Sequence, residues 1–240
     1  MQLFILSLLF ITFLMTKWLQ QQSSRTLAML YFHLFMLMGV SMVSIRVAYT
    51  GTHSFLFFIW NLFLAYLPFL ITSFLQKREV IKGNSLSFYS LFSLWFLFLP
   101  NALYLLTDLK HIRPSPHFLF WYDLLIFIIF ALSGFALALI SLFQMHNLME
   151  KRIGKTFTWI GIVFVCFANG FGVYLGRFLR WNSWDVFTNP LHLASQISKH
   201  FLFPHLYWKA WFITISFGLL FFLVYGMFSM SLKTQEKESL

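Results

Sequence analysis

Seven long, almost uninterrupted apolar stretches are the feature that most limits what this chain can fold into. A helix that crosses a hydrocarbon layer of about 30 Å needs about 20 mostly apolar residues. Because a chain in lipid must satisfy its own backbone hydrogen bonds, each stretch is expected to be a helix. Continuous apolar runs also argue against the alternating pattern of a membrane β-barrel. The predicted spans are residues 2–18, 27–45, 55–75, 86–106, 118–143, 156–178 and 207–230.

The composition disfavours every soluble class. Hydrophobic residues make up 60% of the chain and charged residues only 10%, whereas a soluble domain carries about 25% charged residues. The net charge of +10 comes from Lys and Arg residues scattered among the loops. Such residues orient a membrane protein and contact anionic lipid, so membrane lipids are the expected partners and nucleic acid is not.

We therefore predict an all-α, polytopic membrane protein of about seven transmembrane helices, with one transmembrane domain over 1–230 and a short charged tail over 231–240. The first stretch lacks a basic start and a small-residue cleavage pattern, so we expect it to be retained as a helix. Ten of the 17 Lys and Arg fall on the side of the C-terminus and seven on the other. The positive-inside rule then predicts a cytoplasmic C-terminus and an outward N-terminus.

The connector at 179–206 contains a helix signal of its own. Thr188-Asn189-Pro190 is typical of an N-cap followed by proline at the first helical position. Leu191, Ala194, Ile197 and Phe201 then recur at helical spacing, which favours an amphipathic helix lying in the membrane interface. An ordered loop without a helix is the alternative.

Acidic residues indicate where a polar site could lie. Four of the seven are Glu in the predicted inner loops or tail, and the other three are Asp108, Asp123 and Asp185 at the opposite ends of the helices. Asn101, Tyr104, Asp108 and His111 are spaced by 3, 4 and 3 residues, so they share one helical face. Such a polar stripe must face protein or water, because lipid exposure is costly.

A second polar segment, residues 169–185, follows on the sixth predicted helix. It contains Arg177, Arg180 and Asn182 ahead of Asp185. Ala168, Gly172 and Gly176 recur at intervals of four, and a stripe of small residues lets another helix approach closely. The sequence therefore predicts that the two distant segments fold together into one water-reachable site.

The combination of PNALYLLTDLKH at 100–111 with GVYLGRFLRWNSWD at 172–185 resembles the bacterial integral membrane protein family catalogued as domain of unknown function 1361. The WNLFLA run at 60–65 and the WYD run at 121–123 are similar to that family as well, although Leu103 stands where proline is more usual. The resemblance implies a multi-pass protein of the bacterial cytoplasmic membrane and no catalytic residue.

Three kinds of function stay open. An enzyme acting on an anionic lipid-linked substrate would use Asp108, His111, Asp123 and Asp185 as candidate catalytic groups, which could also hold a divalent metal. Its substrate-binding candidates are Asn101, Tyr104, Arg177, Arg180 and Asn182, since guanidinium groups suit bidentate anion binding. A transporter or flippase for an anionic lipid or small solute is the second. In the third, the Asp residues pair with Arg46, Arg177 and Arg180 only to fix helix packing, as in a structural or accessory subunit.

Overall fold

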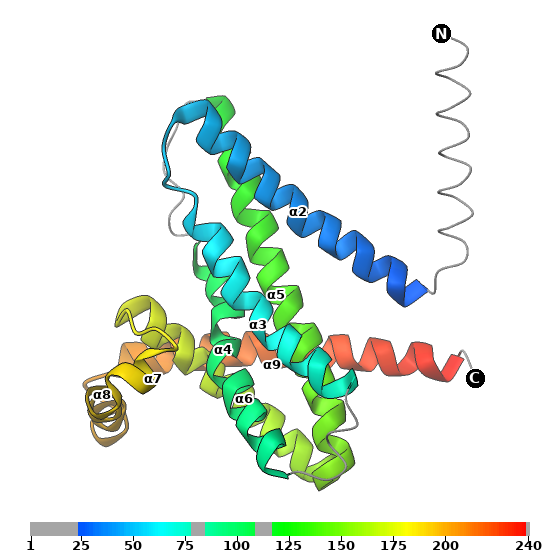
Figure 1. The fold of residues 1–240 in the computed structure, drawn as a ribbon. Helices are drawn as coiled ribbons and strands as arrows, with labels where there is room; N and C mark the ends of the chain where they lie inside the picture. The colour runs from blue at the N-terminus through cyan, green and yellow to red at the C-terminus, as the bar shows by residue number, and fades with distance from the viewer. Residues whose placement is uncertain (1–23, 78–84, 109–116, 239–240) are drawn as a thin grey trace.

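The computed structural model describes residues 24–77, 85–108 and 117–238, and all regular secondary structure in these ranges is helical (Figure 1). No strand occurs in these ranges. The helices are α2 (Ser24–Thr50), α3 (Phe57–Lys77), α4 (Ser85–Thr107), α5 (His117–Ile153), α6 (Lys155–Phe178), α7 (Asp185–Thr188), α8 (Pro190–Leu202) and α9 (Trp208–Glu238).

Six of these helices are long and apolar enough to cross a membrane. They are α2 to α6 and α9, and they coincide with six of the seven predicted spans, which confirms the multi-pass membrane class. The remaining predicted span, 2–18, lies outside the described residues. The count of seven, the orientation of the chain and the cytoplasmic tail therefore stay predictions.

The extent predicted for the fifth span was wrong. The sequence placed a gap at 145–155, but α5 continues to Ile153 and only Gly154 separates it from α6. Gly154 has φ of +79°, a left-handed conformation that glycine adopts at little cost. A fall in hydropathy marks the end of the apolar layer, whereas the helix continues for as long as its backbone hydrogen bonds do.

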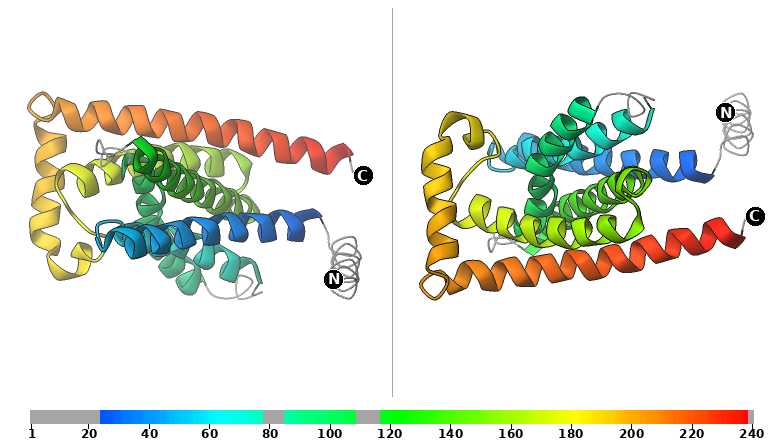
Figure 2. Two further views of the ribbon diagram at one scale, coloured as in Figure 1. Left: turned by 90° about the horizontal axis from the view of Figure 1, so that it is seen from above. Right: turned by 90° about the horizontal axis from the view of Figure 1, so that it is seen from below.

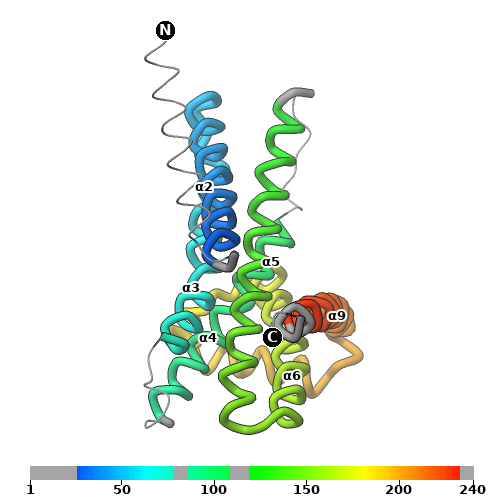
Figure 3. Tube along the Cα trace, turned by 90° about the vertical axis from the view of Figure 1, so that its right-hand side faces the viewer, coloured from blue at the N-terminus to red at the C-terminus, as the bar shows by residue number. Residues whose placement is uncertain are grey.

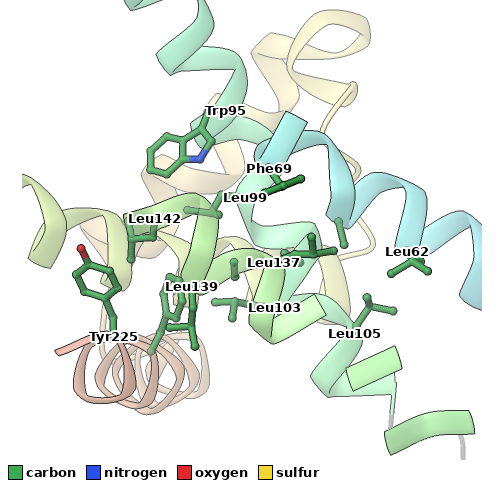
Figure 4. Packing of buried hydrophobic residues seen from close by; sticks show 14 of the residues in the cluster. Leu62, Phe69, Trp95, Leu99, Leu103, Leu105, Leu137, Leu139, Leu142 and Tyr225 are labelled. Atoms are coloured by element: carbon green, nitrogen blue, oxygen red, sulfur yellow. The ribbon is translucent and has the colours of Figure 1, made fainter. Parts of the chain in front are cut away.

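Helix α5 is the centre of the bundle and packs against α2, α3, α4 and α6 (Figures 1 and 3). Leu99 and Leu103 of α4, Leu137 and Leu142 of α5, and Tyr225 of α9 are all at most 1% exposed, and they meet in the core drawn in Figure 4. Because lipid is as apolar as leucine, such contacts stabilise the bundle through close packing rather than through removal from water.

Small residues bring α6 close to α4, as their spacing predicted. A Cβ atom at Gly172 would lie 2.6 Å from Pro100 Cγ, and one at Gly176 would lie 3.1 Å from the ring of Tyr104. On another face of α6, a Cβ at Gly170 would overlap the carbonyl oxygen of Thr214 in α9. These contacts hold the second polar segment against the first.

The helix predicted in the connector is present. Helix α8 begins at Pro190, with Asn189 as its N-cap residue, and α7 forms a single turn before it. Figure 2 shows α8 running across the ends of α6 and α9. Leu193 and His200 lie on the buried face of α8, while Leu191 and Leu202 lie on its exposed face. This amphipathic placement agrees with a helix that lies along a membrane surface.

Candidate functional site

A buried ion pair joins the two polar segments. Arg177 Nη1 of α6 donates a hydrogen bond to Asp108 Oδ1, which follows α4, at 3.1 Å. Asn61 Nδ2 of α3 donates to the other carboxylate oxygen at 3.0 Å. The side chains of Asp108 and Arg177 are only 1% and 9% exposed. The pair thus ties three helices together at one point, and the predicted meeting of the two segments is confirmed.

Arg177 has further partners along the end of α4. Its Nη2 donates to the carbonyl oxygen of Thr107, and its guanidinium lies 5.1 Å from the centre of the Tyr104 ring. Tyr104 Oη accepts a longer hydrogen bond of 3.4 Å from Nη1. Asp108 lies just beyond the spanning part of α4. Burial raises the pKa of its carboxyl, while the Asn61 hydrogen bond and the Arg177 charge oppose that rise.

Asp123 belongs to a different ion pair. The Arg46 guanidinium of α2 donates to its two carboxylate oxygens, from Nε at 2.6 Å and from Nη2 at 3.1 Å. Arg46 also lies 5.1 Å from the centre of the Phe55 ring. The ends of α2 and α5 that carry this pair lie at the top of Figures 1 and 3, away from α7 and α8. The sequence grouped Asp123 with Asp108, and the structure separates them.

Asp185 forms hydrogen bonds within the loop that contains it. Its Oδ2 accepts a hydrogen bond from the backbone N–H of Asn182 at 2.6 Å, and its Oδ1 accepts one from Thr188 Oγ1 at 3.2 Å. These bonds stabilise the turn that leads into α7 and α8. The packing hypothesis expected the three Asp residues to pair with arginines, but Asp185 forms no ion pair among the described residues.

Arg180 stands apart from the other arginines of the site. Its φ is +61°, and it is the only non-glycine residue with positive φ in the described part of the chain. Left-handed backbone costs an ordinary residue about 1–2 kcal/mol, and glycine is the usual occupant where a helix ends in this way. Its side chain is exposed and has no hydrogen bond or ion pair with any described residue.

A cavity of about 1000 Å³ lies beside the first ion pair, between α3, α4, α6, the connector, α8 and α9. Ten of its 28 lining residues are aromatic, so we refer to it as the aromatic cavity. The aromatic residues are Trp60, Phe96, Tyr104, Phe164, Phe167, Phe171, Trp181, Trp184, Phe201 and Trp211. Its volume is within the range of small-molecule sites.

The charged groups that line the aromatic cavity are both positive. They are Arg177 and Arg180, and none of the described lining residues is acidic or a histidine. Asp108 pairs with Arg177, so Arg180 supplies the positive charge that has no counter-ion among the described residues. Asn101 and Asn182 lie at the same end of the cavity, where Asn101 Nδ2 donates to Ser183 Oγ at 2.9 Å. Ser183 Oγ in turn donates to the carbonyl oxygen of Leu97, which fixes the connector on α4.

The residues predicted for the site therefore divide into three groups. The first group meets at the buried ion pair and consists of Tyr104, Asp108 and Arg177. The second group lies on the cavity wall, where Tyr104 and Arg177 are joined by Asn101, Arg180 and Asn182. The third group, Asp123 and Asp185, takes part in other interactions. His111 lies outside the described residues. In the described part of the chain, no three acidic, histidine or cysteine side chains gather to hold a metal ion.

Sequence reasoning missed two polar residues deeper in the cavity, Asn169 on α6 and Thr214 on α9. Both line the aromatic cavity, and both are buried, with 0% and 5% exposure. Asn169 opened the second polar segment and could have been singled out as an amide inside a membrane helix. Thr214 gave no signal, because threonine is ordinary in such helices.

A family model described as "Protein of unknown function (DUF1361)" matches residues 60–224 of the chain. The match covers the aromatic cavity and both residues of the Asp108–Arg177 pair. Comparison with curated proteins and with solved structures found no match.

Proposed function

The chain belongs to the DUF1361 family of proteins of unknown function, and we propose that this member binds an anionic lipid, or an anion linked to a lipid, in its aromatic cavity. The anionic headgroup would lie at Arg180, with the Asn182 side chain donating a hydrogen bond, and the lipid tail would lie along the aromatic walls. The bacterial cytoplasmic membrane, with the cavity facing outward, remains the expected location.

One observation carries this proposal: the aromatic cavity combines apolar walls with an arginine that has no counter-ion among the described residues. A guanidinium is well suited to phosphate and carboxylate groups, which it can bind through two parallel hydrogen bonds. Arg180 keeps its side chain at a backbone position where glycine would cost less. A role for that side chain in binding accounts for the unfavourable backbone.

The cavity lining supports binding better than hydrolysis. General acid–base chemistry needs a titratable group near the reacting atoms, and carboxylates or histidines are the usual groups. The carboxylates predicted for that task are engaged elsewhere: Asp108 with Arg177 and Asn61, Asp123 with Arg46, and Asp185 with its own turn. Asp108 and Arg177 are instead suited to fixing α3, α4 and α6 around the ligand.

The test uses the purified chain in a zwitterionic detergent, with thermal unfolding measured during titration of phosphatidic acid or phosphatidylcholine. Phosphatidic acid should raise the unfolding temperature, because saturation at 100 times the Kd stabilises a protein by about 2.7 kcal/mol. Phosphatidylcholine, whose choline offsets its phosphate charge, should have little effect. Glycerol 3-phosphate, which has the phosphate without the tails, should also have little effect if the apolar walls contribute.

Arg180→Gly is the decisive variant, since glycine suits the left-handed backbone and removes only the side chain. We expect it to unfold at the same or a higher temperature than the native protein and to lose the response to phosphatidic acid. Lys199→Ala is the matched control, because it removes one exposed positive charge from α8 outside the cavity. The proposal is refuted if Arg180→Gly responds to phosphatidic acid as the native protein does.

A further inference from the structure

Two residues that line the aromatic cavity each have a buried polar atom without a hydrogen-bond partner. Asn169 Nδ2 donates to the carbonyl oxygen of Val165 at 2.9 Å, which leaves its Oδ1 without a donor. Thr214 Oγ1 has neither a donor nor an acceptor within reach. Both side chains line the cavity, from the neighbouring helices α6 and α9.

Thr214 differs in this from several other hydroxyl residues of the spans. Ser41, Ser44, Thr72 and Thr158 each donate to the carbonyl oxygen of the residue four positions earlier in the chain. This local bond is the ordinary way for a serine or threonine to be satisfied inside a membrane. A buried hydroxyl that does not form it is unusual, and so is a buried amide oxygen without a partner on the wall of the same cavity.

We propose that Asn169 and Thr214 form a second polar subsite, which binds an uncharged hydroxyl or amide group carried by the tail of the ligand. Asn169 Oδ1 would accept a hydrogen bond from that group, and Thr214 Oγ1 would donate one to it or accept one from it. The subsite rests on the proposed binding of an anionic lipid in the same cavity, and it adds a chemical requirement to the lipid tail.

The helix geometry sets how far this group lies from the headgroup. Asn169 lies nine residues before Phe178, the last residue of α6, which at 1.5 Å per residue corresponds to about 14 Å, and Arg180 follows two residues later. In a phosphatidic acid with 3-hydroxyacyl chains, about seven bonds separate the phosphorus from the hydroxylated carbon, which places that hydroxyl about 9 Å from the phosphate when the chain is extended at roughly 1.3 Å per bond. The long arginine side chain makes up the difference, so a hydroxyl close to the ester end of the tail fits.

The test compares two phosphatidic acids that differ only in this group, one with 3-hydroxymyristoyl chains and one with myristoyl chains. The native protein should bind the hydroxylated lipid about fivefold more tightly, which is the preference that one net hydrogen bond provides. Affinity is measured by the displacement of a fluorescent phosphatidic acid from the detergent-solubilised protein. Thr214→Val and Asn169→Leu should bind the two lipids with equal affinity.

Thermal unfolding of the ligand-free variants separates this subsite from a simple packing role. If the two side chains served only the packing of α6 against α9, Thr214→Val would lower the unfolding temperature and leave the lipid preference unchanged, which would overturn the inference. If they serve the ligand, removing an unpaired polar atom should leave the unfolding temperature unchanged or raise it.

Ser133→Ala is the matched control, because Ser133 Oγ on α5 is also buried without a hydrogen-bond partner but does not line the cavity. It should raise the unfolding temperature without altering the preference between the lipids. Equal binding of both lipids by the native protein overturns the subsite and leaves the proposed function intact. Failure to bind either lipid overturns both.

Discussion

Replacement of Asp108 by asparagine tests the buried ion pair directly, because the amide keeps the shape of the carboxylate and removes its charge. In the native protein the carboxylate accepts hydrogen bonds from Arg177 at 3.1 Å and from Asn61 at 3.0 Å. The variant leaves the Arg177 guanidinium, whose side chain is 9% exposed, without a counter-ion. We therefore expect a large loss of stability from a change of one atom.

The magnitude follows from the surroundings of the two charges. Removal of one partner from a buried pair costs about 3–5 kcal/mol, and the lower end applies because Arg177 keeps the Thr107 carbonyl and the Tyr104 ring. Arg177→Met should cost about as much, since it leaves Asp108 with Asn61 alone. The double variant contains no unpaired charge, so it should cost about 2 kcal/mol rather than the sum of about 6 kcal/mol.

The free energy of unfolding of the native protein, both single variants and the double variant is measured by reversible unfolding in mixed detergent–SDS micelles. A second cycle combines Asp108→Asn with Arg46→Met, which belongs to the other ion pair and shares no partner with Asp108. That combination should be additive to within about 0.5 kcal/mol. Additivity of Asp108→Asn with Arg177→Met would show that the pair contributes nothing specific and would refute the reasoning.

Two further predictions concern the packing of the helices. Gly170→Ala should destabilise the protein by about 1–3 kcal/mol, because the added Cβ would overlap the α9 backbone. Gly226→Ala should stabilise it by up to about 1 kcal/mol through helix propensity, because the added Cβ would have no atom within 4 Å. Tyr122→Phe should cost about 1 kcal/mol, since it removes a 2.9 Å hydrogen bond to the Met42 carbonyl, and Tyr104→Phe should cost less, because its hydroxyl makes only bonds of 3.4 and 3.5 Å. The same micelle unfolding assay checks both pairs, and a reversed order within either pair would contradict the argument.

The spans and the connector helix could be predicted from the sequence because each depends on local chemistry. The length of an apolar run sets a membrane span, and Pro190 after Asn189 sets the start of α8. The meeting of Asp108 and Arg177 was also predictable, since helix parity puts both residues at the same ends of the bundle. These inferences need no knowledge of how the helices rotate about their axes.

The partners of the other charged residues could not be predicted, because they depend on those rotations. Asp123 faces Arg46 of α2 rather than α4, and nothing in the spacing along α5 distinguishes the two directions. The cavity could not be predicted from the sequence for a related reason. Its walls are rich in aromatic residues, and lipid-facing surfaces of membrane helices are too. Whether a phenylalanine faces a neighbour, lipid or a hollow is decided by contacts between helices far apart in the sequence.

The different situations of the two cavity arginines limit the headgroup that the proposed site can bind. Arg180 has no counter-ion among the described residues and can pair with a phosphate or carboxylate without breaking an existing contact. A diphosphate would require a second cation, and the other arginine among the described lining residues, Arg177, could provide it only by leaving Asp108. That exchange would cost about 3–5 kcal/mol for a newly unpaired buried charge, against about 1.5–3 kcal/mol gained from a hydrogen bond to a charged group. A single phosphate or carboxylate is therefore the headgroup that this site should prefer over a diphosphate.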